Sequence, residues 1–284
     1  MEKYIPIFLL CIFLILLISE NIFPLRKRKY KFIPRFFLNL LFTGLVFLAG
    51  SLIVRNAALK SSEWIVNQGF GVTSMISLPT WGNILLGVLL LDLTFYYWHW
   101  LNHNLPLFWR FHSIHHIDPD LDVSTSFRFH FVEIVYSAPF RVVQVFILGI
   151  SPLTYLIYEA LFTCGTLFHH SNVRLPLTIE RLLNRVIVTP RMHGIHHSTV
   201  RNETNSNYSV IFSWWDRFHK TLVLNVPQLS IKIGVPAYQA IKDNRFWALI
   251  ITPFMKQREY DRDANGSYPR SNQEITLKAT RMIE

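Results

Sequence analysis

Histidines grouped into three short motifs constrain the fold of this chain more than any other feature. All twelve histidines lie between His99 and His219. Eight of them form one HxxxH and two HxxHH motifs, namely His99, His103, His112, His115, His116, His193, His196 and His197. Residues three and four apart share one face of a helix, so we expect each motif to direct its imidazoles towards one spot. The three segments should therefore fold against one another.

Neutral imidazole is the commonest protein ligand for zinc and the redox metals, and eight exceed the needs of one metal. The motifs thus predict a two-metal site, with isolated core or surface histidines as the alternative. His130, His169 and His170 are added as further ligands, or else as hydrogen-bond partners of ligands. His219 has no motif partner within helical reach and is expected at the surface. Both cysteines lie in apolar segments and are expected to be buried, which leaves imidazole as the main ligand type.

The composition favours a membrane protein. The chain of 284 residues is 51% hydrophobic and only 16% charged, whereas soluble domains carry about a quarter charged residues. The net charge is +10, and a dense basic block from Arg26 to Arg35 lies between two apolar stretches. A basic block next to a membrane span follows the positive-inside rule, so nucleic acid is not expected as a partner.

Four apolar regions predict the membrane helices. Tyr4–Ser19 is the first, and a cleavable signal peptide fits it poorly because its basic block follows the apolar run. Phe36–Val54 has 19 residues, about 28 Å of helix, enough to cross the hydrocarbon core. Trp81–Trp98 is the third. Phe131–Phe168 is split by Ser151-Pro152 and should form a hairpin that enters and returns.

We therefore predict an all-α polytopic membrane protein with about four to five transmembrane or re-entrant helices and a cytoplasmic helical cap. The basic block is assigned to the cytoplasm, which places residues 55–80 outside as a short connection and every histidine motif on the cytoplasmic side. Three regions are expected: N-terminal helices (1–80), a histidine-rich domain (81–221) and a C-terminal cytoplasmic or interfacial segment (222–284). Within the last, 246–254 should dock or lie at the interface, and the tail from Lys256 should pack loosely.

Several acidic residues could support the site. Asp92 lies two helical turns before His99 and could accept a hydrogen bond from a ligand histidine, line the substrate entrance or pack helices. Carboxylates often accept the second N–H of a metal-bound imidazole. The candidates on the cytoplasmic side, which could equally be solvated charges or structural partners, are Asp118, Asp120, Asp122, Glu133 and Asp216.

The ordered motifs HWLNH, HSIHH and MHGIHH resemble those of the fatty acid hydroxylase / sterol desaturase superfamily. Supporting pieces are FRFHFVE, FHHSNV and NYSVIFSWWDRFHKT, and the resemblance covers Trp81–Thr221. Two departures concern substrate details: Phe131 stands where the family usually has proline, and the chain reads WDRFHKT where the family usually has glycine before the final threonine.

The resemblance implies a membrane-embedded oxygenase with two non-haem iron ions, O₂ as co-substrate and a separate electron-donor protein. It also implies orienting or bracing roles for Asn172, Asn207 and Asp216. Hydroxylation of an apolar lipid C–H bond is the expected reaction, and desaturation by the same site is the alternative. The substrate could be a fatty acyl chain, a sterol or hopanoid, a carotenoid or an ether lipid.

Two other classes remain open from the residues alone. A membrane zinc hydrolase would be expected to carry HExxH, and this motif is absent from the sequence. A metal carrier should place its ligands across the membrane midplane, whereas these motifs follow the ends of the spans. The lack of retrieval or transit signals and of a fused donor domain favours an integral protein of the bacterial inner membrane.

Overall fold

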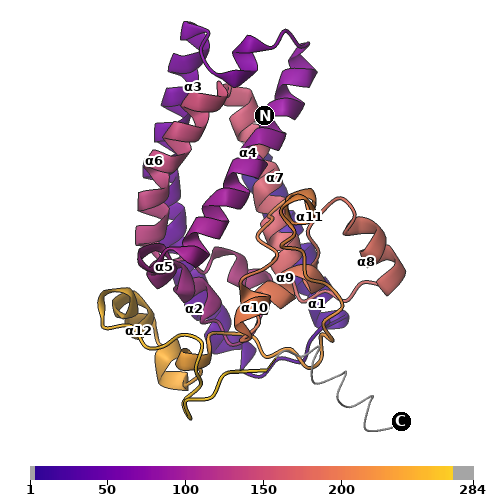
Figure 1. Cartoon of the computed structure of the whole chain (residues 1–284), viewed down its shortest axis with the longest axis vertical. Helices are drawn as coiled ribbons and strands as arrows, with labels where there is room; N and C mark the ends of the chain where they lie inside the picture. Colours follow the sequence, from indigo (N-terminus) through magenta and orange to yellow (C-terminus); the bar gives the residue numbers. More distant parts are fainter. Residues whose placement is uncertain (1–3, 271–284) are drawn as a thin grey trace.

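The computed structural model describes residues 4–270, and within that range the regular secondary structure is helical apart from three isolated β-bridges. Five helices are long: α1 (Ile5–Ile22), α2 (Phe32–Ala49), α4 (Thr80–Asn104), α6 (Phe131–Leu148) and α7 (Pro152–His170). They run along the length of the molecule in Figure 1, with α1 and α2 reaching its lower half.

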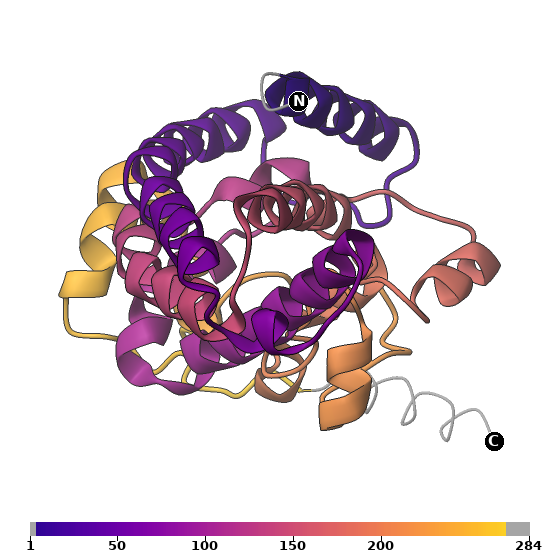
Figure 2. The same ribbon diagram turned by 90° about the horizontal axis from the view of Figure 1, so that it is seen from above.

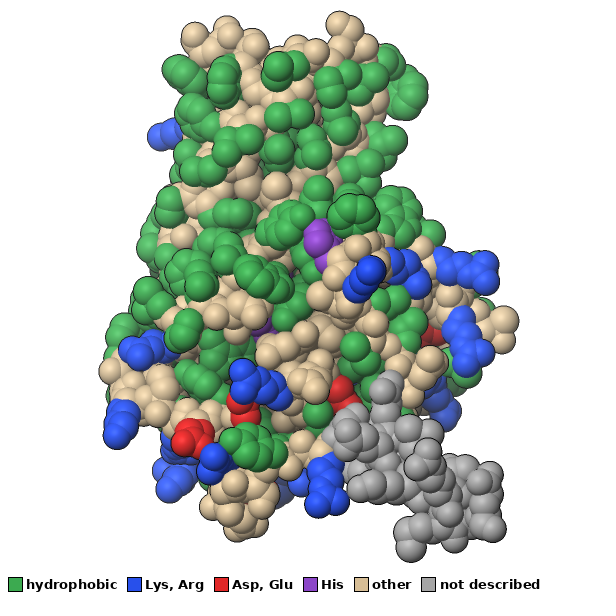
Figure 3. Space-filling model, in the orientation of Figure 1, with side chains coloured by type: hydrophobic (Ala, Val, Ile, Leu, Met, Phe, Trp, Pro, Cys, Tyr) green, Lys and Arg blue, Asp and Glu red, His purple; other side chains and the backbone are tan. Residues whose placement is uncertain are grey.

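Four of the five long helices, all except α7, have the length and composition of membrane spans. Four helical runs among the described residues are apolar enough to cross a bilayer: Ile5–Ile22, Phe32–Met75, Thr80–Asn104 and Phe131–Leu148. Figure 3 shows the upper part covered by hydrophobic side chains, whereas charged side chains gather below. Cys11 lies on this exposed surface and is not buried as expected. The predicted all-helical membrane fold is confirmed.

The second span continues where the sequence predicted a short connection. After α2 the chain runs through one π-helical turn (Gly50–Arg55) directly into α3 (Asn56–Gln68). Ala58, Ser62 and Ile65 recur at helical spacing and are buried, and α3 packs against α6. The helix ends at Gly69, whose φ of 63° is the left-handed conformation that glycine adopts readily. The packing face of α3 was not recognised in the sequence because polar residues surround it.

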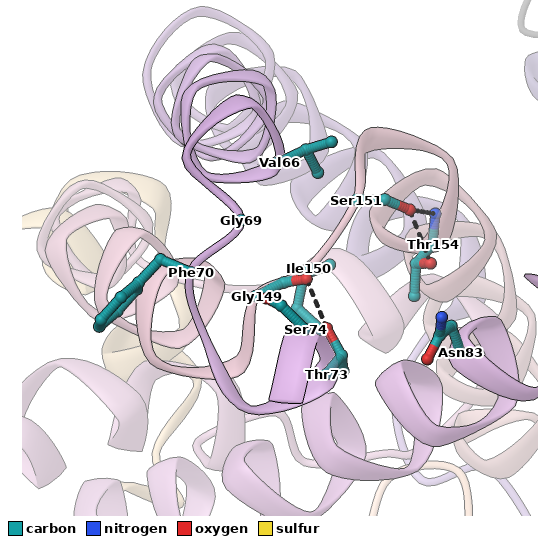
Figure 4. Close-up of a pocket in the computed structure, with 10 residues that line it drawn as sticks. All are labelled: Val66, Gly69, Phe70, Thr73, Ser74, Asn83, Gly149, Ile150, Ser151 and Thr154. Atoms are coloured by element: carbon teal, nitrogen blue, oxygen red, sulfur yellow. Dashed lines mark hydrogen bonds between the residues drawn. The ribbon is translucent and has the colours of Figure 1, made fainter. Parts of the chain in front are cut away.

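The hairpin of α6 and α7 turns where the sequence predicted. Gly149 ends α6 with a φ of 74°, and Ser151 caps α7 by accepting a hydrogen bond from the Thr154 N–H, with Pro152 as the first helical residue. A cavity of about 200 Å³ adjoins this turn, at the end of the bundle away from the histidines, and Figure 4 shows its lining residues.

Short helices gather at the opposite end of the bundle (Figure 1). They are α5 (Pro106–His116), α8 (Leu177–Leu183), α9 (Pro190–His196), α10 (Arg201–Thr204), α11 (Trp214–His219) and α12 (Phe246–Ile251). The predicted docking segment 246–254 comprises α12 and a 3₁₀ turn (Thr252–Phe254), and Leu249 of α12 packs in one core cluster with Phe42 of α2. Of the tail predicted to pack loosely, residues 271–284 lie outside the described range. Seen along the bundle in Figure 2, α1 lies at its edge and α12 and α8 on opposite flanks.

Part of the basic block is structural. Arg26 and Arg35 are buried, and the Arg35 guanidinium contacts the carboxylates of Asp118 and Asp122. This ion-pair network joins the start of α2 to the segment that follows α5. A buried charge of this kind is stable only when it is paired and hydrogen-bonded. These arginines therefore hold the cap to the bundle and are not available to lipid headgroups.

Candidate metal centre

Nine histidines form two adjacent groups. Within each group, one ring nitrogen of every member lies within 4.8 Å of those of the others. Group one comprises His99, His103, His112, His116 and His196, and group two comprises His115, His170, His193 and His197. All nine are buried. The groups touch, because the rings of His116 and His197 stack with their centroids 4.3 Å apart.

Each HxxHH motif is divided between the two groups. His112 and His116, four residues apart, belong to group one, whereas His115 belongs to group two. In the second motif His193 and His197 belong to group two and His196 to group one. The expectation that all three imidazoles of one HxxHH motif share a spot is wrong. Residues i and i+4 stay together, and the residue at i+3 is rotated enough to serve a neighbouring site.

Short, sharply started helices bring the motifs together. α4 ends at Asn104 and α5 begins two residues later at Pro106, so two histidine motifs are separated by one tight turn. α9 begins at Pro190, and Thr189 caps it by accepting a hydrogen bond from the Met192 N–H. Proline is favourable at the first helical position because its missing N–H would have no intrahelical partner there.

In group one, the Nδ1 atoms of three of the five histidines are anchored by oxygen atoms. Hydrogen bonds join Nδ1 of His99 to the Tyr208 carbonyl (2.7 Å) and Nδ1 of His196 to the Ser206 carbonyl (2.7 Å). Nδ1 of His112 lies 2.9 Å from Oε1 of Glu133. Among the described residues, four buried Nε2 atoms of this group have no hydrogen-bond partner, those of His103, His112, His116 and His196. A metal-bound imidazole is expected to have one nitrogen bonded to an oxygen and the other free for the metal.

In group two the Nε2 atoms face one another. Nε2 of His170 lies 3.0 Å from Nε2 of both His115 and His193, and Nε2 of His193 lies 3.1 Å from that of His197. The Nδ1 of His170 contacts the Thr166 carbonyl, whereas the Nδ1 atoms of the other three have no hydrogen-bond partner in the described part of the chain. Four buried nitrogens converging in this way suit a shared cation.

The environment keeps the imidazoles neutral. Burial, together with neighbouring imidazoles, holds the pKa well below its ordinary value for His115, His116, His193, His196 and His197. Only a neutral imidazole has a lone pair to give to a metal. Nine buried imidazoles with few other partners fit a pair of metal ions, and neither group contains a cysteine.

One irregular segment, residues 206–210, orients three of the histidines. The carbonyls of Ser206, Tyr208 and Val210, at alternate positions, meet the Nδ1 atoms of His196, His99 and His169 respectively. No sequence signal pointed to these carbonyls, because any residue type can supply one.

Asp92 and Asp216 hold this segment in place. Asp92 accepts hydrogen bonds from the N–H groups of Ile211 and Phe212 and from the Trp215 indole. The sequence spacing between Asp92 and His99 allowed a hydrogen bond from a ligand histidine to Asp92. No such hydrogen bond is present among the described residues. Asp216 accepts from the N–H groups of Tyr208 and Ser209. Both carboxylates are buried and act on the histidines through the backbone.

The two asparagines brace loops away from the histidine rings. The Asn172 amide exchanges hydrogen bonds with the backbone of Arg26, which joins the end of α7 to the segment after α1. Asn207, at a φ of 54°, donates to the Met192 and Val223 carbonyls and accepts from the Val223 N–H. Neither side chain has a hydrogen bond to a histidine of the two groups in the described residues.

Two of the histidines predicted as ligands lie outside the groups. His130 caps α6, with Nδ1 accepting from the Val132 N–H and Nε2 at 3.2 Å from the Ile250 carbonyl. His169 is anchored to the Val210 carbonyl, and its ring centroid lies 4.0 Å from that of His193. Of the predicted carboxylates, Glu133 contacts a group histidine. Asp118, Asp120 and Asp122 bind Arg35 or the backbone near Lys29 instead.

A cavity of about 220 Å³ adjoins group one. Its lining includes His103, Trp109 and Tyr260, and an ion pair between Arg201 and Asp261 lies in its wall. His103 of group one lines this cavity directly, and the Trp109 ring lies beside it, with its centroid 4.8 Å from that of His103. Small polar reactants could reach group one from this side.

The fold and the histidines together define a helical membrane protein with a paired histidine site at one end of its bundle. Residues 84–221 match the family model described as fatty acid hydroxylase. This match to the fatty acid hydroxylase family covers just under half of the chain, and it confirms the resemblance seen in the motifs. No solved structure is significantly similar to the chain.

Relatives with assigned activities share this segment. The ornithine lipid hydroxylase OlsE of Rhizobium tropici is 29% identical over 61% of this chain and 51% of its own length. Human cholesterol 25-hydroxylase is 29% identical over 49% of this chain and 51% of its own. Human alkylglycerol monooxygenase is 29% identical over 50% of this chain and 30% of its own. The chain spans about half, or less, of the length of these relatives.

Proposed function

We propose that this protein is a lipid hydroxylase with two metal ions, iron in both positions, that uses O₂ to oxidise an apolar C–H bond. The observation that carries the proposal is the pair of buried histidine groups, with five and four members. Structural zinc sites normally close with four ligands and often include cysteine. Two adjacent all-imidazole groups suit redox metals with open positions between them. Relatives over the same segment are hydroxylases and a monooxygenase by name.

Bound iron would supply the capacity to reduce O₂ and to remove hydrogen from an unactivated C–H bond. The nine histidines of the two groups would hold it. Glu133 and the carbonyls of Ser206 and Tyr208 fix which imidazole nitrogen faces the metal, since each receives an Nδ1–H. Burial of every ring excludes bulk water and so protects the reaction from side products. His130 and His169 support this arrangement from outside the two groups.

The substrate would be an apolar lipid that reaches the site from the bilayer. α4 carries His99 and His103 in its last turns and is itself a candidate membrane span. α7 ends at His170 of group two. A lipid chain lying along these helices would therefore present one of its carbons at the histidines. Hydroxylation is favoured over desaturation because the relatives' names describe hydroxylation or mono-oxygenation.

The remaining assignments extend the same proposal. Electrons would come from a separate redox protein, and the cavity beside His103 and Trp109 offers the shortest polar approach to group one. The histidine end would face the cytoplasm of a bacterial inner membrane. Regions 1–80, 81–221 and 222–284 would serve as anchor, oxidising domain and cap.

The decisive experiment measures metal content and product together. Detergent-purified protein grown with ample iron should contain about two metals per chain, mostly iron. With a lipid extract, ¹⁸O₂ and a chemical reductant, it should place ¹⁸O in one lipid class. A His193→Ala/His196→Ala variant should lose both properties. The matched control is His219→Ala, because His219 belongs to neither group and contacts Tyr97 and Trp215.

Two results would overturn the proposal. Stoichiometric zinc with hydrolysis that does not require O₂ would identify a hydrolase. Full metal content in the double variant would show that the two groups do not hold the metal.

A further inference from the structure

A surface on the flank of the cap exposes an unusual number of apolar side chains. We call it the α8–α11 surface. It comprises the exposed apolar residues of α8, α11 and the turn after α8, namely Leu177, Ile179, Leu182, Val186, Trp214 and Phe218. Phe218 is 78% exposed and Leu182 62%. The two segments adjoin, because the Trp214 indole donates a hydrogen bond to the Arg185 carbonyl. Apolar side chains exposed near one another mark a binding surface more often than a water-facing one.

The exposed charges around these residues are all basic. Within 174–186 and 214–220 they are Arg174, Arg181, Arg185, Arg217 and Lys220. The two acidic residues in these ranges are buried: Glu180 binds Arg191, and Asp216 binds backbone N–H groups. Figure 3 shows basic side chains gathered on the flank where α8 and α11 lie in Figure 1. Such a surface is complementary to an anionic one.

The length and position of α8 indicate a bilayer surface as the partner. Its seven residues span only about 10 Å, far too little to cross a membrane. Only six residues separate it from the end of α7, so α8 lies within about 25 Å of the point where α7 ends. Apolar residues beside arginine, as on α8, and beside tryptophan and arginine, as on α11, are typical of short helices that lie in the headgroup region.

We propose that the α8–α11 surface lies in the headgroup layer of an anionic leaflet, on the histidine side of the membrane. Leu182 and Phe218 would enter the acyl boundary, and Arg181 and Arg185 would contact lipid phosphates. This role lies outside the proposed chemistry and requires no bound metal.

The surface is tied to the metal site. Glu180 of α8 accepts hydrogen bonds from the N–H and Nε of Arg191 in α9. The Asn184 side chain, just after α8, lies against the Met192 sulfur. The backbone carbonyl of Asn184 accepts a hydrogen bond from the Ser213 hydroxyl. Because α9 carries His193 and His196, seating α8 on lipid fixes the height of both histidine groups relative to the bilayer.

The opposite flank repeats the pattern. Trp247 of α12 is 70% exposed and Ile241 is 72% exposed. Lys242 and Arg245 are exposed beside them, whereas Asp243 is buried against Arg258. Figure 2 shows α8 and α12 on opposite sides of the bundle. Two basic, apolar elements on opposite flanks would seat the cap evenly on one leaflet.

Site-directed spin labels test the position of the surface. In a Cys11→Ser/Cys164→Ser background, labels at Leu182→Cys and Phe218→Cys are compared with one at the exposed turn residue Asn265→Cys. The full chain is placed in nanodiscs of phosphatidylglycerol and phosphatidylcholine. Contact with lipid-soluble O₂ should exceed contact with a water-soluble nickel complex several-fold at 182 and 218, and the order should reverse at 265. Nickel contact at 182 and 218 equal to that at 265 would overturn the proposal.

A charge series tests the anionic leaflet. In pure phosphatidylcholine nanodiscs the labels at 182 and 218 should lie nearer to water than in the anionic nanodiscs. Arg181→Gln/Arg185→Gln should reproduce that shift in anionic nanodiscs, whereas Lys60→Gln/Arg262→Gln, which removes two exposed charges elsewhere, should not. Equal depth in both lipids, or equal shifts from both double variants, would overturn the assignment of an anionic partner.

Discussion

The two histidine groups are built differently. In group one, the Nδ1 atoms of His99, His196 and His112 are held by oxygens of Tyr208, Ser206 and Glu133. In group two the Nε2 atoms of His115 and His193 approach that of His170 directly, and three Nδ1 atoms lack a hydrogen-bond partner in the described residues. Group one thus holds its shape through the protein, whereas group two depends on what lies between its rings. A bound cation would organise group two more than group one.

Removing one ligand histidine from either group should have the largest effect on metal content and lipid oxidation. His112→Ala should remove the metal from group one, and His193→Ala should remove it from group two. Each variant should therefore bind about one metal ion per chain instead of about two. Lipid oxidation should fall by more than about 100-fold in both, since even the partners of ligands are worth 10–100-fold. Metal analysis and ¹⁸O incorporation measure the two quantities. If either variant kept two metals, that group would not be a separate site.

Acidification should destabilise the metal-free protein through buried histidines of both groups, three of which belong to group two. The pKa values of His115, His193 and His197 are held well below the ordinary value by burial and by neighbouring imidazoles. The unfolded chain therefore takes up protons first, near pH 6.5. The stability from these neutral rings is complete above that pH and is lost as the pH falls, by about 1.4 kcal/mol per pH unit for each proton taken up.

Thermal unfolding of the chelator-treated protein between pH 8 and pH 5 measures this loss. The Tm should fall steeply below pH 6.5, and a His115→Gln/His197→Gln variant should show a shallower fall. An equally steep fall in that variant would locate the sensitivity elsewhere.

Removing a hydrogen-bond partner of a group-one histidine should weaken the binding of one metal ion and leave the binding of the other unchanged. Glu133→Gln keeps the size of the side chain but removes the charge that faces Nδ1 of His112. The metal of group one should bind about 10- to 100-fold more weakly, because partners of ligand histidines contribute that much. Competition with a chelator should show one metal released early and one late. Simultaneous release of both would show that the groups act as one unit.

The sequence predicted which histidines form this site better than it predicted how they contact one another. The HxxxH and HxxHH motifs identified eight of the nine grouped histidines, because helical spacing is visible in a sequence. The division of each HxxHH motif between groups depends on where a second helix approaches, and this is a tertiary property. Asp92 was likewise interpreted from its position on the same helix as His99. Its actual hydrogen-bond partners come from residues 211–215, which approach it only in the tertiary structure.

The fold shows the same contrast between local and tertiary information. The turn at Ser151-Pro152 was predicted because both residues act locally. The continuation of α2 into α3 was missed because residues 56–68 are helical through contacts with α6, which leave no apolar run in the sequence. The carbonyls that orient His99 and His196 were invisible for a related reason, since their role depends on backbone position and not on residue type.

The smallest expected effect on metal binding comes from removing a weak hydrogen-bond partner of a group-one histidine. The Asn205 amide oxygen lies 3.4 Å from Nδ1 of His103, near the limit for a hydrogen bond. Asn205→Ala should therefore cost only about 0.5 kcal/mol of metal binding, roughly a twofold change, at the low end for a hydrogen bond. The same chelator competition used for Glu133→Gln measures it. A loss as large as that of Glu133→Gln would mean that the contact shortens when metal binds, and that group one too acquires part of its order from the cation.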